Sequence, residues 1–227
     1  MSKAATFLKS QVGRKIATGV TGLGLVLFIM VHLLGNLSYF AGADAINLYS
    51  HTLHQLEPLL WIVRLGLLVF FVYHVWLGIS IWLDSKKTTP IHYTVEATRG
   101  GLSRKTWSSR SMILTGVLLL LFVFTHLYTF ALYDFKPTEV NGVAMHDVHA
   151  RLTEVFQQPV YTVYYVVIMV LLGMHLRHGI WSAFQSLGWM SRKTNPTIYT
   201  IAYVLALVVA IGFIGLPVSI YIGQFLS

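Results

Sequence analysis

Long apolar segments alternate with short polar connections along the chain. A helix that crosses the hydrocarbon core of a bilayer needs about 20 mainly apolar residues, because no backbone group can stay unpaired there. Five segments of this kind occur, at residues 16–40, 59–83, 111–133, 160–187 and 197–225. The pattern predicts an all-α integral membrane bundle of five transmembrane helices, formed by one domain that spans residues 1–227.

The composition also favours a bilayer over water. Of the 227 residues, 56% are apolar and 11% are charged, against about 25% charged in an ordinary soluble domain. The net charge of +8 comes from basic residues scattered between the apolar segments, so it does not indicate nucleic-acid binding. The chain has no cysteine, which excludes disulfides and thiolate-held iron–sulfur clusters within it. Membrane lipid is therefore the expected surrounding.

Lys and Arg concentrate on alternate connections. Four precede the first span, six lie between the second and third, and two lie between the fourth and fifth, whereas the other two connections hold few. Short loops rich in these residues stay in the cytoplasm. We therefore expect a cytoplasmic amino terminus and a carboxyl terminus on the outside.

Histidines within the spans carry the first functional signal. An ionisable side chain inside a membrane is costly, so each one indicates a function. Five lie within the predicted spans: His32, His74, His126, His175 and His178. A neutral imidazole is a good axial ligand for haem iron, and a six-coordinate haem between helices needs two imidazoles at one depth. These histidines therefore predict haem binding.

Depth along the helices suggests how the histidines pair. At 1.5 Å per residue, His32 and His126 lie about 26 and 24 Å from the basic residues that flank their spans. By the same rule, His74, His178 and His175 lie at about 18, 21 and 26 Å. The depths predict two b haems, one between His32 and His126 and one between His74 and His178. His175, on the same helix face as His178, is expected to contact a propionate or to support a ligand, although depth does not exclude it as the ligand.

Other residues near the histidines have two interpretations each. Arg177 is a natural partner for a haem propionate, but snorkelling to the cytoplasmic interface explains it almost as well. Several glycines in the spans either give room for a flat macrocycle or let membrane helices pack closely. They are Gly19, Gly22, Gly24, Gly78, Gly116, Gly173 and Gly179. The sequence leaves both pairs of alternatives open.

The outer connection between the first two spans contains His54 and Glu57. Oxidising a quinol releases protons, so a carboxylate or imidazole within reach of the quinone oxygens is chemically needed. His54 and Glu57 are therefore the expected residues of a quinone site. An ordinary solvated loop acid is the alternative for Glu57.

Three stretches of the sequence resemble one known family. They are HLLGNL at residues 32–37, SRSM at 109–112 and HLRHGIWSAFQSLG at 175–188. These stretches are similar to the five-helix cytochrome b membrane anchors of succinate:quinone oxidoreductases. In that family the anchor subunit of succinate dehydrogenase or fumarate reductase, in its di-haem type B form, holds two b haems.

The resemblance implies a place in the respiratory chain and the tricarboxylic acid cycle. Carried over to this chain, it implies haem ligands at His32 and His126 for the distal haem and at His74 and His178 for the proximal one. It also implies a flavoprotein and an iron–sulfur subunit on the cytoplasmic side of a prokaryotic inner membrane, with menaquinone as the quinone. The chain alone is not expected to oxidise succinate.

Two alternatives remain at this stage. The nearer alternative is a di-haem cytochrome b subunit of another membrane dehydrogenase, such as a hydrogenase or formate dehydrogenase, although those proteins differ in the spacing of their histidines. A haem-free transporter whose histidines bind substrate or protons is the other alternative. The spans contain no Asp or Glu that a proton pump would use, which weighs against the transporter.

Overall fold

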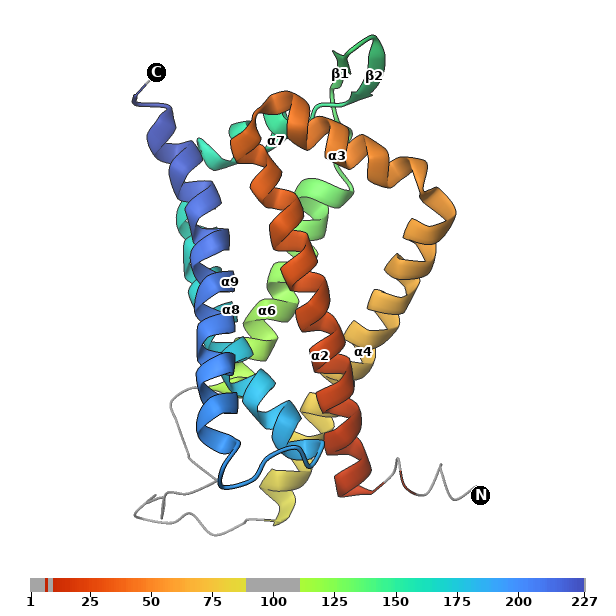
Figure 1. Ribbon diagram of the computed structural model, residues 1–227, viewed down its shortest axis with the longest axis vertical. Coiled ribbons are helices and arrows are strands. Elements are labelled where there is room, and N and C mark those ends of the chain that lie inside the picture. The colour runs from red at the N-terminus through yellow and green to blue at the C-terminus, as the bar shows by residue number, and fades with distance from the viewer. Residues whose placement is uncertain (1–6, 8–9, 89–110, 227) are drawn as a thin grey trace. The chain divides into compact units, whose positions relative to one another are not determined.

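The computed structural model describes residues 7, 10–88 and 111–226 (Figure 1). In this part of the chain, five helices are long and apolar enough to cross a membrane. They are α2 (Gln11–Leu37) continued by the 3-10 turn η1 (Ser38–Ala41), α4 (Glu57–Thr88), α6 (Met112–His126) continued by the π turn η2 (Leu127–Ala131), α8 (Pro159–Ser186) and α9 (Asn195–Gly223). The predictions of an all-α chain and of five transmembrane helices are confirmed, apart from one short hairpin.

The predicted orientation rests partly on basic residues that lie outside the described part of the chain. The basic residues outside the described part of the chain are Lys3, Lys9, Arg99, Arg104, Lys105 and Arg110.

Large apolar side chains cover one side of α4. Leu68, Val69, Val72 and Trp76 are each more than half exposed, and their spacing puts them on one helix face. An aqueous surface rarely carries a contiguous apolar patch of this kind. Lipid is the medium that such a face requires.

The chain forms two compact units. The first comprises residues 1–27, 67–117 and 173–207, and the second comprises residues 28–66, 118–172 and 208–227. His74, His175 and His178 belong to the first unit, whereas His32 and His126 belong to the second.

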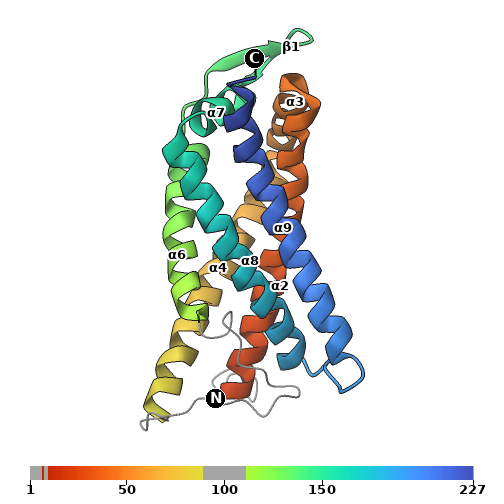
Figure 2. The ribbon, with the colours of Figure 1, turned by 90° about the vertical axis from the view of Figure 1, so that its left-hand side faces the viewer.

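Close helix contacts and polar links hold the first unit together. An added Cβ on Gly19 would lie 3.3 Å from the Ala183 Cα, so α2 and α8 approach closely there. Arg14 on α2 and Asp84 on α4 form an ion pair of 2.6 Å. The connection that leads from α8 into α9 (Figure 2) is fixed by Trp181, whose Nε1 donates to the Asn195 Oδ1 at 3.0 Å.

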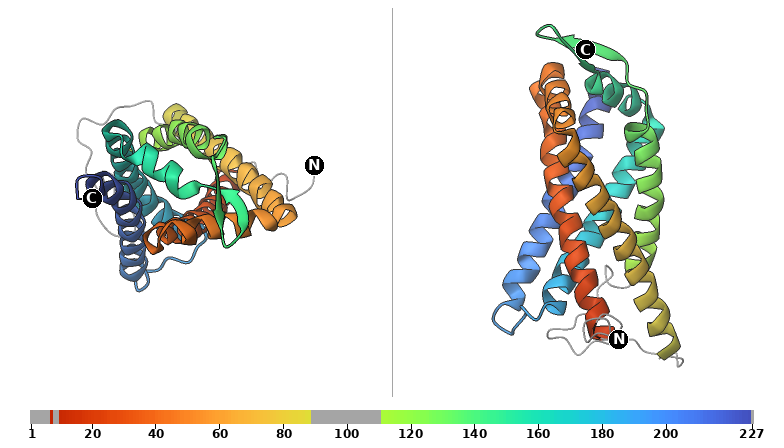
Figure 3. Two further views of the ribbon diagram at one scale, coloured as in Figure 1. Left: turned by 90° about the horizontal axis from the view of Figure 1, so that it is seen from above. Right: turned by 90° about the vertical axis from the view of Figure 1, so that its right-hand side faces the viewer.

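The second unit contains short elements that the apolar pattern did not predict. They are α3 (Ala43–Gln55), the strands β1 (Pro137–Val140) and β2 (Val143–His146), and α7 (Val148–Phe156). Helix α3 packs against α7 and both strands (Figure 3). The hydrophobic core of this unit consists of Ile46, Leu152, Val155, Phe156, Tyr165, Leu216 and Ile220.

Polar contacts fix α3 to α7. Asn47, which is buried, donates to Asp147 at 3.2 Å and accepts from the His149 backbone N–H at 3.0 Å. The Asp147 side chain also accepts from the Ala150 N–H, which makes Asp147 the N-cap of α7. The Tyr39 hydroxyl lies 2.9 Å from the Thr153 hydroxyl. These bonds fix α7, the helix that precedes α8 in the chain, against α3 and Tyr39.

Candidate functional site

In the first unit, His74 on α4 faces His175 on α8. Their ring centres lie 6.5 Å apart, and both residues are half-buried. The Thr21 hydroxyl oxygen lies 3.3 Å from the His74 Nδ1, and the Thr115 hydroxyl oxygen lies 3.1 Å from the His175 Nδ1. We call His74 and His175 the inner pair, after the cytoplasmic side that the sequence predicts for this level. In each ring, the Nδ1 lies within hydrogen-bond distance of a threonine hydroxyl.

His178 has different surroundings. It lies three residues after His175, and its ring centre is 5.8 Å from that of Trp181. Among the ring contacts of the described residues, His74 meets His175 and not His178. The structure thus brings His74 together with the histidine that the depth estimate ranked second.

In the second unit, His32 on α2 faces His126, the last residue of α6. Their ring centres lie 5.8 Å apart. Phe28 stacks on His32 at 5.4 Å, and Phe122 and Phe130 each lie 5.4 Å from His126. This outer pair is therefore enclosed by aromatic rings.

The polar partners of the outer pair differ between the two rings. The His126 Nδ1 lies 3.2 Å from the Tyr165 hydroxyl. The Asn36 amide nitrogen lies 3.3 Å from the His32 Nε2 and donates to the His32 carbonyl at 2.8 Å. Among the described residues, the other nitrogen of His126 has no hydrogen bond, whereas the His32 Nε2 lies beside the Asn36 amide.

A π-helical turn, η2 (Leu127–Ala131), follows His126 directly. Arg151 on α7 donates to the Thr129 carbonyl in this turn from both Nε and Nη2, at 3.2 and 3.1 Å. Its guanidinium also lies 3.5 Å from the centre of the Tyr133 ring. Isolated π turns are frequent at functional sites, and here Arg151 satisfies a carbonyl that the turn exposes.

Both pairs have the spacing that a shared metal requires. A bond between a metal and an imidazole nitrogen is about 2 Å, so two rings on opposite sides of one metal have centres about 6 Å apart. The separations of 5.8 and 6.5 Å lie on either side of that value. Within the described residues, no group of three or more His, Asp or Glu side chains is placed to hold a metal ion. Each pair thus has the ring spacing that two imidazole ligands of one metal would have.

Comparison with known proteins assigns the chain to a family. The model of the family described as succinate dehydrogenase/fumarate reductase transmembrane subunit matches residues 85–216, more than half of the chain. The chain belongs to this family. No curated protein and no solved structure matches it.

Family membership sets the coarse function of this transmembrane subunit. The chain is a multi-pass membrane anchor subunit of succinate dehydrogenase or fumarate reductase, and it associates with the catalytic subunits of that complex. Members of the family often bind haem b. The resemblance noted in the sequence is thus confirmed at the level of the family, which favours the anchor over a transporter or a subunit of another dehydrogenase.

Arg177 of the subunit contacts α9. It donates a hydrogen bond to the Tyr199 hydroxyl, and its guanidinium lies 5.2 and 5.8 Å from the ring centres of Tyr199 and Tyr203. Two aromatic rings therefore contact the Arg177 guanidinium, which the sequence suggested as a partner for a haem propionate. A guanidinium has five N–H donors, so the bond to Tyr199 leaves others available.

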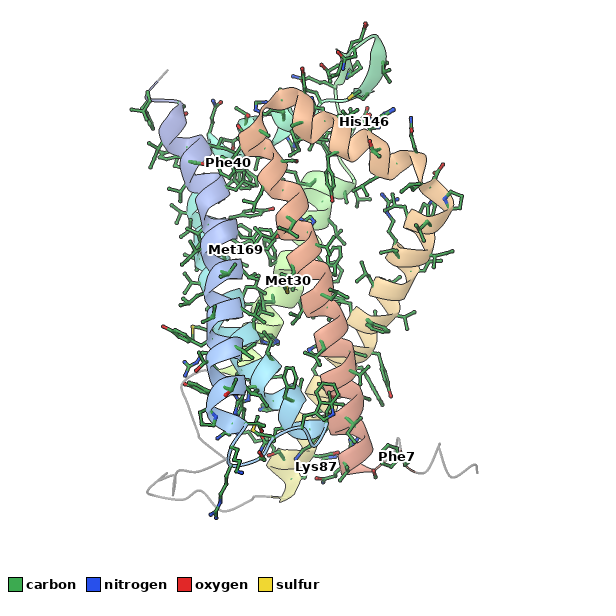
Figure 4. All side chains as sticks on the ribbon, in the orientation of Figure 1. Phe7, Met30, Phe40, Lys87, His146 and Met169 are labelled. Carbon is green, nitrogen blue, oxygen red and sulfur yellow. The ribbon has the colours of Figure 1, made fainter. Side chains whose placement is uncertain are left out.

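The outer residues His54 and Glu57 separate in the structure. His54 lines a pocket of about 350 Å³ between α3 and the hairpin, next to His146. Figure 4 labels His146, the last residue of β2. The ring centres of these two histidines lie 6.1 Å apart, and the His54 Nδ1 donates to the Ser50 carbonyl at 2.8 Å. Glu57 is exposed in the first turn of α4 and does not line the pocket. The pocket residues lie outside the candidate spans.

Proposed function

We propose that this transmembrane subunit holds two b haems and lets electrons pass between an iron–sulfur subunit and membrane quinone. The observation that carries the proposal is the presence of two facing imidazole pairs, one in each unit, at 5.8 and 6.5 Å. Bound haem would supply a one-electron carrier at each pair. The helices supply the ligands, and the apolar surroundings exclude water from them.

In this proposal His32 and His126 are the ligands of one haem, and His74 and His175 are those of the other. Three contacts support His175 over His178: its ring faces His74, Thr115 bonds its Nδ1, and the His178 ring packs on Trp181 instead. Counting along a helix does not account for tilt, which changes depth by several Å. His178 takes the supporting role near a propionate, together with Arg177.

The partners and the orientation complete the proposal. A cytoplasmic amino terminus puts the basic connections opposite a flavoprotein and an iron–sulfur subunit, at a prokaryotic cytoplasmic membrane, with the carboxyl terminus outside. Residues 1–227 act as one cytochrome b domain. Lys86, Lys87, Arg192 and Lys193 are exposed, which supports docking of a partner through charge.

His54 and Glu57 are proposed as proton acceptors for quinol, with menaquinone as the quinone. The His54 Nδ1 is committed to the Ser50 carbonyl, so its Nε2 has a lone pair that accepts a proton. Glu57 is exposed at the start of α4, where a carboxylate remains accessible to a proton released beside the span.

Reduced-minus-oxidised spectra and pyridine haemochrome assays on the purified complex test the ligand set. We expect two haems per anchor subunit in the parent and one in the His175→Leu variant, because one axial ligand is lost. His178→Leu is the matched control on the same helix face and should keep two. Loss of a haem in His178→Leu with two retained in His175→Leu would reverse the ligand choice, and a parent without haem would refute the proposal.

A further inference from the structure

Two Thr-Gly pairs lie against the inner histidines. Thr21 and Gly22 on α2 contact His74, and Thr115 and Gly116 on α6 contact His175. Thr21 and Thr115 are buried, at 6% and 1% exposure. The same dipeptide on two helices thus meets the two imidazoles of one pair in the same way.

The hydroxyl of Thr115 has a single proton and several neighbours. Its oxygen lies 3.0 Å from the Ser111 carbonyl, 3.2 Å from the Met112 carbonyl and 3.1 Å from the His175 Nδ1. A carbonyl can only accept, so the hydroxyl donates its proton toward the two carbonyls and offers a lone pair to the ring. The His175 Nδ1 is therefore the protonated nitrogen, and it donates to Thr115.

Thr21 repeats this arrangement on α2. Its hydroxyl oxygen lies 2.8 Å from the Ala17 carbonyl and 3.2 Å from the Thr18 carbonyl, whereas the His74 Nδ1 is farther, at 3.3 Å. The shortest bond takes the hydroxyl proton. The His74 Nδ1 then donates to the oxygen, and the Thr18 backbone forms a further hydrogen bond with the His74 ring.

The glycines let the rings come this close to the helices. A Cβ on Gly22 would lie 3.1 Å from the His74 Cε1, and one on Gly116 would lie 3.4 Å from the His175 Cε1. Both distances are at or below ordinary van der Waals contact. A methyl group at Gly22 would therefore make the His74 ring shift by a few tenths of an ångström, whereas one at Gly116 would lie in ordinary van der Waals contact with the His175 ring.

We infer that Thr21 and Thr115 are positioning residues that fix the inner histidines as Nδ1–H tautomers and aim each Nε2 lone pair at one metal. The inference rests on the proposed function and names two residues that act on it. Donation from Nδ1–H makes the imidazole a more basic ligand, which favours the ferric state. Removing the acceptor oxygen therefore raises the reduction potential of the haem at this pair.

Redox titration of the purified complex, followed by optical spectroscopy, tests the inference. Thr115→Val preserves size and removes the oxygen, and Thr115→Ser restores it. We expect Thr115→Val to keep two haems and to raise the potential of one of them. A tenfold change in the relative stability of the two oxidation states corresponds to about 59 mV for one electron. The haem that shifts should be the one lost in His74→Leu.

Thr18→Val is the matched control. Thr18 lies one turn before Thr21, and its hydroxyl donates to the Arg14 carbonyl and not to an imidazole. Valine removes this hydroxyl and keeps the backbone group that bonds His74, so this variant should leave both potentials unchanged. Loss of one haem in Thr115→Val with recovery in Thr115→Ser also supports the inference. Unchanged potentials with two haems in Thr115→Val, or a loss that Thr115→Ser does not restore, would overturn it and leave the haem proposal intact. A parent without haem would instead refute the proposed function.

Discussion

The space beside Gly22 is tight, so the addition of one carbon atom there tests the inner pair. A methyl group on this residue would lie 3.1 Å from the His74 Cε1, so the ring must move by a few tenths of an ångström. We expect Gly22→Ala to weaken haem binding at this pair about tenfold, as changes around metal ligands do. Haem content per anchor subunit measures the effect.

Gly78 provides the control for this substitution. It lies one turn after His74 on α4, and a Cβ there would meet nothing within 4 Å. Gly78→Ala should therefore keep the full haem content. Equal haem content in the two variants would show that the room beside His74 has no influence on the site.

Single residues also show where sequence reasoning reaches its limit. The intramembrane histidines stand out because a polar ring in lipid is costly. Depth pairs His32 with His126, whose rings do face each other. It ranks His178 before His175 as the residue opposite His74, whereas the ring that faces His74 is that of His175, because facing rings depend on helix rotation and tilt as well as on rise. The Thr-Gly dipeptides at residues 21–22 and 115–116 do not stand out in the sequence, since residues 18–19 repeat them, and their contacts with His74 and His175 are visible only in the structure.

At the scale of elements, the requirements of a bilayer made the long helices predictable from the sequence, whereas they gave no information on the short helices. A span must be long and apolar whatever it packs against, so the five predicted segments fall on five helices. Helices α3 and α7 are short and depend on contacts with each other. The hairpin did have a local signal, since Asn141 and Gly142 take the positive φ angles, 53° and 78°, that a two-residue type I′ turn requires.

The π turn after His126 depends on one side chain from another element. Arg151 is largely buried, at 15% side-chain exposure, and donates twice to the Thr129 carbonyl. Arg151→Met leaves that carbonyl unpaired, which should destabilise the second unit by about 1.5–3 kcal/mol. Thermal denaturation of the complex in detergent, followed by loss of the haem absorbance, measures the change.

A substitution at Glu154 distinguishes the effect of the hydrogen bonds from Arg151 to the Thr129 carbonyl from the effect of the ion pair between Arg151 and Glu154. The Glu154 carboxylate lies 3.3 Å from the Arg151 Nη1, and its side chain is 52% exposed. Exposed ion pairs contribute about 0–1 kcal/mol, so Glu154→Gln should lower the denaturation temperature much less than Arg151→Met. If the two variants lose the same stability, the ion pair and not the carbonyl contact is the important interaction.

At the scale of the whole molecule, an anchor must combine a ligand site within the membrane with a docking surface outside it. Lys86 and Lys87 lie on the same helix as His74, but more than three helical turns after it, about 18 Å along the axis, so the two tasks should be separable by substitution. Lys86 and Lys87 are exposed in the last turn of α4, on the side that the basic connections assign to the cytoplasm. Charge there should attract a catalytic subunit without touching the imidazole pairs.

Reversing these charges tests both the docking and the orientation. We expect Lys86→Glu with Lys87→Glu to weaken retention of the catalytic subunits several-fold during purification, most clearly at raised ionic strength, because salt screens exposed charges. Haem content and spectra should stay at the parent level. Lys136→Glu, at an exposed lysine just before β1, is the control and should retain the partners. Loss of the catalytic subunits in the Lys136 variant, with retention in the double variant, would place the docking surface on the opposite side and reverse the proposed topology.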